Sequence, residues 1–248
     1  MTEIPESHPR YESLVARERL VEMVHMGIVS EAGLIAHGRG EAYDYLIGEK
    51  TNDFAERAEM AAVAALLLDE HTVISVNGNA AALSGKELIE LGKITGSRIE
   101  VNLFHRTEER VEKIVCYLEE MGGKDILGPE PDAEIPGLEH SRALCHKDGI
   151  YSADTVLVPL EDGDRAEALK KMGKTVITID LNPLSRTARA ADITIVDNIT
   201  RAVPNMIKFA EEMGAAPEMG LRAAMNSFDN AEALREALEE IASAVKRL

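Results

Sequence analysis

Apolar residues recur with a helical period through most of the first seventy residues. From Tyr11 onward their spacing predicts an amphipathic helix that follows Pro9 and ends at Gly27. Residues 53–56 resemble a capping box, and the alanine-rich sequence behind them predicts another helix to about Asp69. The N-terminal part of the chain is therefore expected to be helical.

Residues 36–41, which read AHGRGE, lie between these helical segments. Two glycines beside a histidine and an arginine form a turn-prone run, whereas an ordinary surface turn needs no such cations. We interpret this run as a turn that binds an anion.

The period changes after residue 70. Five short runs rich in β-branched and apolar residues predict strands at 72–76, 98–104, 154–160, 174–180 and 192–197. Helical patterns, including those over 80–94 and 107–121, lie between and after them. Continuously apolar strands that alternate with helices are typical of a parallel sheet covered on both faces.

These patterns predict an α/β fold, a Rossmann-like parallel sheet with an N-terminal helical cap. We expect residues 1–70 to form the cap and residues 71–248 to form the domain that contains the sheet. The segment 122–150, rich in Gly, Pro and acids, is predicted to be a long and functional loop. Residues 230–247 predict a helix that packs in the core or in a dimer interface.

The net charge and the composition of the chain limit the classes of ligand that the protein is expected to bind. The chain of 248 residues carries a formal net charge of −17, and only 4% of its residues are aromatic, with no Trp. General binding to nucleic acid is therefore not expected, because it needs clustered cations and stacking side chains. No apolar run approaches the roughly 20 residues of a membrane span, so we expect a cytoplasmic protein. Cys116 and Cys145 are predicted to be buried free thiols.

Three predicted strands end in polar residues, at 76–80, 180–187 and 197–201. Ligands of an open parallel sheet bind beyond the carboxyl ends of its strands. At the first end, Asn77-Gly78-Asn79 suits either close approach of a ligand or a turn that needs glycine. At the second end, Arg and Thr follow an Asn-Pro loop, which favours a ligand over simple helix capping. The third end could be a helix cap alone, and its proximity to the second favours a shared nucleotide pocket.

Histidines and arginines mark further candidates. His105-Arg106 follows the second strand at another ligand-facing end. Arg17 is by default a solvated helix residue. His140 and His146 flank Cys145 with a spacing that matches no common zinc pattern, so no metal site is expected. The sequence contains no Walker A motif, Ser-His-Asp elbow or HExxH.

Several runs together carry a resemblance to one known family. They are IPESHPRYESLVARERLV, GLIAHGRGEAYDYLIGE, SVNGNAAAL, VNLFHRTEERVEKI, TVITIDLNPLSRTARAADITIVDNITRA and PNM, in order over most of residues 4–214. They resemble the archaeal phosphopantothenate synthetases, also called 4-phosphopantoate–β-alanine ligases. The resemblance is weaker over 122–150 and the C-terminal helix.

The resemblance implies a homodimeric, ATP-dependent ligase of coenzyme A biosynthesis with a Rossmann-like core. The family joins 4-phosphopantoate to β-alanine and releases AMP and diphosphate. By motif position, its ATP contacts should fall on Arg17, Arg39, Asp180, Leu181, Asn182, Arg186, Thr187, Asn198 and Ile199. Residues 36–41 then look like a hinge that delivers Arg39 to the triphosphate.

Release of AMP implies an acyl adenylate, and such a reaction depends on neutralising phosphate charge. We expect Arg17 and Arg39, together with Mg²⁺, to stabilise the transferring phosphate. The residues expected to hold phosphopantoate are Asn77, Gly78, Asn79, His105 and Arg106. His37 is the candidate for receiving the proton of the β-alanine amine, with water as the alternative.

Two other functions are compatible with parts of the sequence. A nicotinamide-dependent oxidoreductase would need a full GxGxxG after the first strand, where the sequence reads NGNAAA. A non-catalytic sensor of AMP or a phosphosugar would need only the run DLNPLSRTA, and it would bind nucleotide without turnover.

Overall fold

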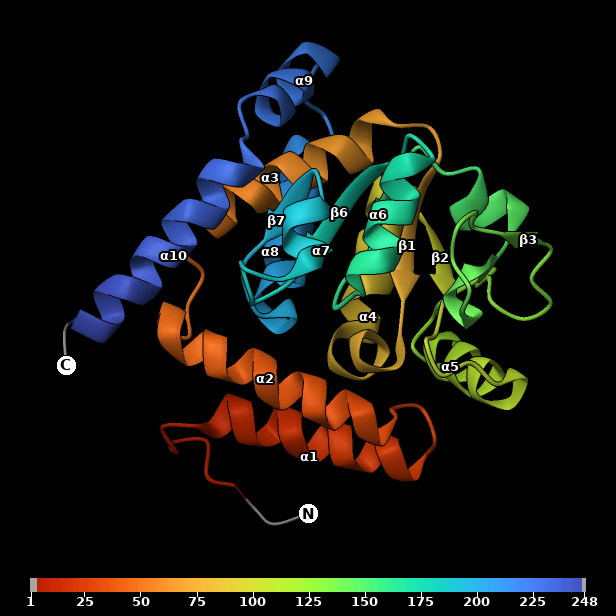
Figure 1. Cartoon of the computed structure of the whole chain (residues 1–248), viewed down its shortest axis with the longest axis horizontal. Coiled ribbons are helices and arrows are strands. Elements are labelled where there is room, and N and C mark those ends of the chain that lie inside the picture. Colours follow the sequence, from red (N-terminus) through yellow and green to blue (C-terminus); the bar gives the residue numbers. More distant parts are fainter. Residues whose placement is uncertain (1–3, 247–248) are drawn as a thin grey trace.

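The computed structural model describes residues 4–246, and its centre is a five-stranded parallel sheet (Figure 1). The strands are β1 (Thr72–Val76), β2 (Arg98–Val101), β5 (Thr155–Leu157), β6 (Thr175–Ile179) and β7 (Ile193–Ile195). All five predicted strands are confirmed, and so is the α/β fold class. Several strands are shorter than their predicted runs; β5, for example, covers only Thr155–Leu157 of the predicted 154–160.

Side chains that alternate along the strands enter two separate cores. Ile74, Val76 and Ile177 pack with helices α3 (Asp53–Leu68), α4 (Gly78–Thr95), α5 (Glu108–Glu120) and α8 (Ile199–Met213). Val73 and Val176 point to the opposite core, against α6 (Gly163–Lys171). Both faces of the sheet are therefore covered, as expected for continuously apolar strands.

The strand order is β2-β1-β5-β6-β7. The strand that follows β1 in the chain, β2, lies on one side of it, whereas β5, β6 and β7 are added on the other side, so the order reverses between β1 and β5. This is the 2-1-3-4-5 order of a doubly wound sheet, in which ligands bind at the reversal point. Val73 pairs with Val156 across it, and Asn77 after β1 donates to the carbonyls of Pro159 and Leu160 after β5.

Helices α1 (Tyr11–His25) and α2 (Glu31–Ile47) lie side by side beyond the strand ends (Figure 1). The predicted turn at residues 36–41 is wrong, because α2 runs through it without a break. Each interior glycine costs a helix about 1 kcal/mol relative to alanine. Contacts along α2 offset this cost: Gly33 meets Asn79, and Glu41 pairs with Arg17.

The start of α3 also differs from its prediction. Asn52, not Asp53, is the residue before the first helical turn, and no side-chain capping bond forms there. The Asn52 amide instead donates to the carbonyls of Ile47 and Lys50, which closes the connection from α2. The helix ends before Asp69 as predicted. Alanines of α3 pack in the sheet core, so the domain boundary predicted at residue 70 stays a prediction, and this packing favours an earlier one.

Segment 122–150 is more ordered than a loop. It contains the short antiparallel pair β3 (Ala133–Glu134) and β4 (Leu144–Cys145), with helical turns η1 (Ser141–Ala143) and η2 (Lys147–Tyr151). The buried Glu100 of β2 accepts hydrogen bonds from the backbone nitrogens of His146 and Ile150. A Cβ on Gly149 would lie 2.0 Å from the Glu100 carboxylate. Glycine at this position therefore lets the segment dock on the sheet.

The C-terminal residues form two further helices, α9 (Glu218–Asn226) and α10 (Asn230–Lys246). Ala233 and Leu234 of α10 pack with Phe54 of α3 and Val196 after β7. This packing confirms a core role for the predicted last helix. Residues 1–3 of the predicted cap and residues 247 and 248 at the predicted C-terminal end lie outside the described residues.

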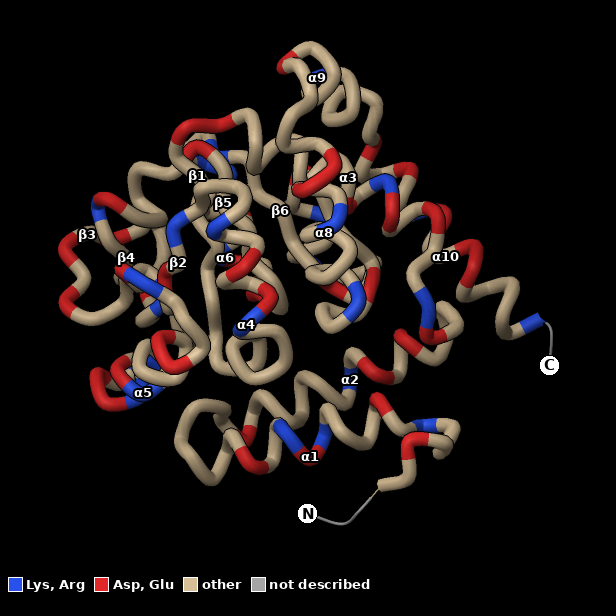
Figure 2. The backbone as a smooth tube through the Cα atoms, turned by 180° about the vertical axis from the view of Figure 1, so that it is seen from behind, with Lys and Arg blue, Asp and Glu red and all other residues tan. Residues whose placement is uncertain are grey.

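Acidic residues occur on most helices, with Lys and Arg interspersed among them rather than gathered on one face (Figure 2). No helix within residues 4–246 has both the length and the hydropathy that crossing a membrane requires.

Glu59 of α3 is a carboxyl group with no exposed surface. Burial, and next the neighbouring Asp197 carboxylate, raise its pKa from 4.5 to about 9. Glu59 is therefore protonated at neutral pH in the folded protein and ionised in the unfolded chain.

We predict that Glu59→Gln gains stability over the parent protein as pH rises. The difference in the free energy of unfolding between the variant and the parent should grow by roughly 1.4 kcal/mol per pH unit. This growth should span pH 4.5 to about 9, because over that range the folded parent keeps a proton on Glu59 that its unfolded state releases. Urea unfolding at several pH values measures it. Glu90→Gln, at an exposed position of α4, is the control. A stability difference that is constant with pH would contradict this assignment.

Candidate active site

A cavity of about 770 Å³ lies at the carboxyl edge of the sheet, between the strand ends and α2. Its volume is within the about 300–1,000 Å³ typical of small-molecule sites. The predicted site residues that line it are His37, Arg39, Asn77, Gly78, Asn79, His105, Asp180, Leu181, Asn182, Thr187, Asn198 and Ile199. Segments far apart in the sequence thus meet around one cavity.

Three predicted cations do not line this cavity. Arg17 donates from Nε to Glu41 at 2.8 Å, which joins α1 to α2. Arg106 donates to the carbonyl of Gly128. Arg186 is half exposed and forms ion pairs with Asp164 and Glu167 of α6. Each of these guanidiniums is held by another part of the protein, so their predicted ligand contacts stay predictions.

Residues 77–79, which follow β1, pack closely against neighbouring segments. The side chain of Asn77 caps α4 by accepting from the Ala80 nitrogen, and it donates to the carbonyls of Pro159 and Leu160 after β5. A Cβ on Gly78 would lie 2.3 Å from the carbonyl oxygen of Ile28. Asn79 donates to the Gly33 carbonyl of α2 at 2.9 Å. The run therefore ties both halves of the sheet and α2 together at one point.

The run after β6 is organised by Asp180. Its carboxylate accepts hydrogen bonds from the Asn182 nitrogen and the Ser185 hydroxyl. Burial raises the pKa of Asp180, against the opposing effects of these hydrogen bonds and of Arg39. Helix α7 (Arg186–Ala190) begins after Ser185, whose side chain caps it by accepting from the Ala188 nitrogen. The loop 180–185 is thereby held rigid beneath the cavity.

One face of α2 forms a wall of the cavity and presents His37 to it. The His37 Nε2 atom is buried, has no hydrogen-bond partner in the described chain, and lies 3.9 Å from Glu41 Oε2. Burial lowers the pKa of His37, although Glu41 opposes the shift. The imidazole is therefore neutral at pH 7 and can accept a proton.

Arg39 enters the same cavity from the next part of α2. No hydrogen bond or ion pair engages its guanidinium within residues 4–246, and Asp180 is the acid that responds to its charge. A cation without a protein partner in a ligand-sized cavity is suited to bind an anion.

The model of the phosphopantothenate/pantothenate synthetase family matches residues 54–244 of the chain. The chain belongs to this family. A relative from Methanosarcina mazei named 4-phosphopantoate–β-alanine ligase is 57% identical over all of this chain and 98% of its own length. A relative of the same name from Thermococcus kodakarensis is 55% identical over all of this chain and 95% of its own length.

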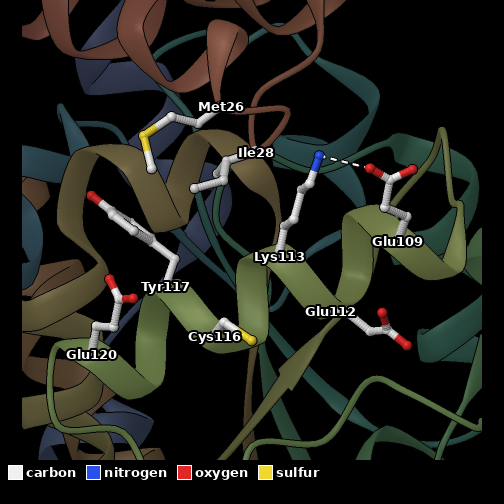
Figure 3. Close-up of a pocket in the computed structure, with 8 residues that line it drawn as sticks. All are labelled: Met26, Ile28, Glu109, Glu112, Lys113, Cys116, Tyr117 and Glu120. Atoms are coloured by element: carbon white, nitrogen blue, oxygen red, sulfur yellow. Dashed lines mark ion pairs between the residues drawn. The ribbon is translucent and has the colours of Figure 1, made fainter.

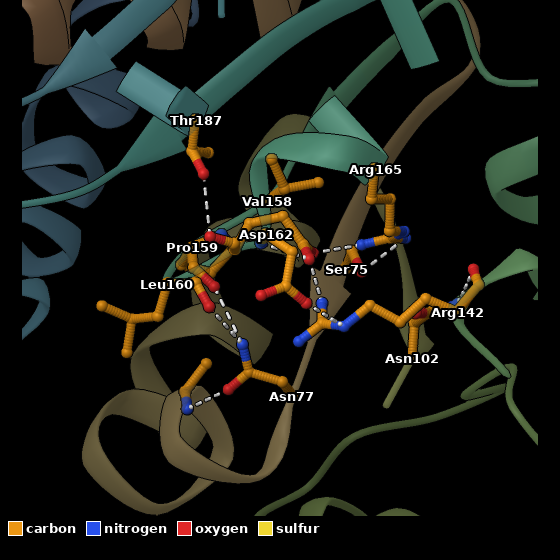
Figure 4. A network of polar contacts seen from close by, with 12 residues as sticks. Ser75, Asn77, Asn102, Arg142, Val158, Pro159, Leu160, Asp162, Arg165 and Thr187 are labelled. Carbon is orange, nitrogen blue, oxygen red and sulfur yellow. Dashed lines mark hydrogen bonds and ion pairs between the residues drawn. The ribbon is translucent and has the colours of Figure 1, made fainter. Parts of the chain in front are cut away.

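In this synthetase-family chain, the structure also reveals site residues that the sequence analysis missed. Arg142, from segment 122–150, reaches the cavity and forms an ion pair with Glu161 after β5 (Figure 4). Glu161 also binds the fully buried Arg165 of α6, whose Nη2 donates to Ser75 at 3.1 Å. The two guanidiniums lower the pKa of Glu161 against the effect of its burial. No local motif signals this network, because its members are distant in sequence.

A second missed group joins α2 to the start of α8. Asp44 of α2 accepts from Arg201 at 2.5 Å and from the Asn198 amide at 3.0 Å. Arg201 also pairs with Asp197, which accepts the Asn198 backbone nitrogen at 2.7 Å. Asn198, a cavity residue, is thus oriented by an acid on the opposite wall. We name Asp44, Asp197, Asn198 and Arg201 the α2–α8 latch.

A smaller cavity of about 350 Å³ lies apart from this site, between α5 and the connection after α1 (Figure 3). Lys113 in its wall is paired with Glu109, and Tyr117 and Met26 supply apolar surface. Cys116, another lining residue, is exposed, so the predicted burial of both thiols holds for Cys145 alone. Residue 116 lies on the exposed side of α5, and for this reason the predicted burial of its thiol was wrong.

We predict that Asp44→Ala lowers the free energy of unfolding by about 3 kcal/mol, because it removes one acid of a buried ionic cluster. Denaturant unfolding measures the change. Glu236→Ala is the matched control: it breaks the more exposed ion pair with Arg57 and should cost under about 1 kcal/mol. Equal losses in the two variants would show that the latch contributes no more than a surface pair.

Proposed function

We propose that this chain is an ATP-dependent ligase that joins 4-phosphopantoate to β-alanine, giving 4′-phosphopantothenate, AMP and diphosphate. One observation carries the proposal. The segments that the family resemblance assigns to ATP and to the acid substrate line one cavity, although they follow different strands. The names of relatives that cover the whole chain at 57% and 55% identity support it.

Nucleotide is proposed to bind over the ends of β6 and β7. Asp180 and Asn182 offer acceptors and donors there, Thr187 offers a hydroxyl, and the start of α8 at Asn198 offers backbone N–H groups. Arg39 lines the same cavity, and its charge opposes the rise in the pKa of the Asp180 carboxyl. It is the cation proposed to stabilise the phosphate under attack.

Two substitutions make up the proposed chemistry. A carboxylate oxygen of 4-phosphopantoate attacks the α-phosphorus of ATP, and diphosphate leaves. The nitrogen of β-alanine then attacks the acyl carbon, and AMP leaves with the electrons of the broken C–O bond. The attacking amine must lose a proton in this second step, and the neutral, unpartnered Nε2 of His37 is the proposed acceptor.

Mg²⁺ would neutralise part of the triphosphate charge. The cavity suits a Mg²⁺ ion that is bound mainly by the phosphates of the nucleotide. Asp180 and Glu161 are already engaged by protein donors, and Asp162 pairs with Arg142 through one oxygen while its side chain is partly exposed at the cavity wall. Asp162 is the carboxylate proposed to hold the ion. Within residues 4–246 no group of three or more His, Cys, Asp or Glu is arranged for a metal.

The homodimer that the resemblance implies and the cytoplasmic location expected from the sequence remain part of this proposal. The sensor alternative is less favoured, because it leaves His37 and Arg39 of α2 without a role. The oxidoreductase alternative lacks its glycine motif, since NGNAAA after β1 forms an asparagine-capped helix start.

Product analysis with ATP, Mg²⁺, 4-phosphopantoate and β-alanine tests the function. We expect AMP, diphosphate and 4′-phosphopantothenate in equal amounts. ADP and phosphate would keep the ligase but replace the adenylate by an acyl phosphate. ATP binding without turnover would favour the sensor.

We predict that His37→Gln lowers kcat by roughly 10²-fold, the lower range for a general base, with little change in the KM for ATP. The parent kcat should fall with decreasing pH only below 6.5, because burial lowers the pKa of His37 from that value. This acid limb should be absent in the variant. His25→Gln, at an exposed position of α1, is the control. An unchanged acid limb would transfer the role to water.

A further inference from the structure

Arg110 of α5 is a half-buried cation in the cavity wall. Its Nε and Nη2 donate to the carbonyl of Ile28 at 3.0 and 2.9 Å, and its Nη1 donates to the carbonyl of His105 at 3.0 Å. These partners are neutral, and no carboxylate pairs with Arg110 within the described residues. Its orientation is therefore fixed while its charge stays uncompensated.

Arg142 is a second cation of this wall, with 8% of its side chain exposed. Nη1 binds Glu161, and Nε lies 3.0 Å from Asp162. In Figure 4 the third nitrogen of the Arg142 guanidinium lies on the side of Asn77. Two acids thus hold the guanidinium and leave one donor for the cavity.

The charge of Arg142 acts on Arg110. Burial, and next the charge of Arg142, lower the pKa of Arg110. Helix α4 begins beside them, and the backbone nitrogens of Gly78 and Asn79 in its first turn have no intrahelical acceptor. The unpaired charge of Arg110, a further donor of Arg142 and a helix start thus lie in one wall, where an anion with several acceptor oxygens would be stabilised.

We propose that Arg110 and Arg142 bind the phosphate monoester of the acid substrate and select the phosphorylated acid over its unphosphorylated form. This inference rests on the proposed function. A phosphate dianion matches two guanidiniums better than the single charge of the β-alanine carboxylate. It also fits the geometry, because Arg110 and Arg142 lie near β1 and β2 and the proposed nucleotide site lies over β6 and β7. The acid carries its phosphate and its carboxylate at opposite ends, so its carboxylate would face ATP.

The test compares kcat/KM for 4-phosphopantoate and for pantoate. Arg110→Gln should lower the value for 4-phosphopantoate by roughly 10- to 100-fold, as expected for one charge-assisted contact, and leave the value for pantoate nearly unchanged. Inorganic phosphate should compete with 4-phosphopantoate in the parent and less well in the variant. Lys113→Gln, which removes a cation from the same helix outside this cavity, should keep the parent preference.

Arg110→Lys provides a second variant, because it keeps the charge and loses the fork of donors. An intermediate preference in this variant would support the inference even if Arg110→Gln folds poorly. Equal losses with both acids would overturn the inference and leave Arg110 a structural role. An increase confined to the KM for β-alanine would also overturn it. A parent protein that neither binds nor converts either acid would refute the proposed function itself.

Discussion

Burial of both faces of the parallel sheet is the constraint on which the site depends. Every strand of the sheet contributes apolar side chains to a buried core, and polar side chains inside the strands, such as Ser75 and Glu100, are hydrogen-bonded within the protein, which leaves the strand ends for ligands. The reversal of strand order between β1 and β5 opens the carboxyl edge at that point. Helix α2 then covers this edge and turns it into a cavity of about 770 Å³. The arrangement of the site thus follows from how the core is buried.

The cavity is suited to anions even though the chain carries a net charge of −17. Its buried acids are used internally: Glu161 is shared by Arg142 and Arg165, and Asp180 accepts hydrogen bonds from its own loop. Arg39 keeps its charge without an acidic partner in the described residues. Local pairing, rather than total charge, therefore decides what the site can bind.

The sequence was informative where local patterns determine structure. Strands and most helices follow from β-branched runs and apolar periods, and residues at strand ends lie where parallel topology requires. The turn at residues 36–41 was wrong, because contacts with distant partners hold the glycines in α2. Arg142 was missed, since its place depends on Glu161, which lies after a different strand. Local reading also could not tell that Arg186 turns to α6 while its neighbour Thr187 faces the cavity.

The continuity of α2 has a consequence for how this site tolerates changes in chain length. A straight helix turns by about 100° per residue. One residue inserted between Gly33 and His37 would keep Gly33 against Asn79 but rotate His37 and Asp44 away from the cavity and from Arg201. Only insertions whose length restores the helical phase would be tolerated. The number of residues that separate the contacts along α2 is therefore as much a part of the site as the residues themselves.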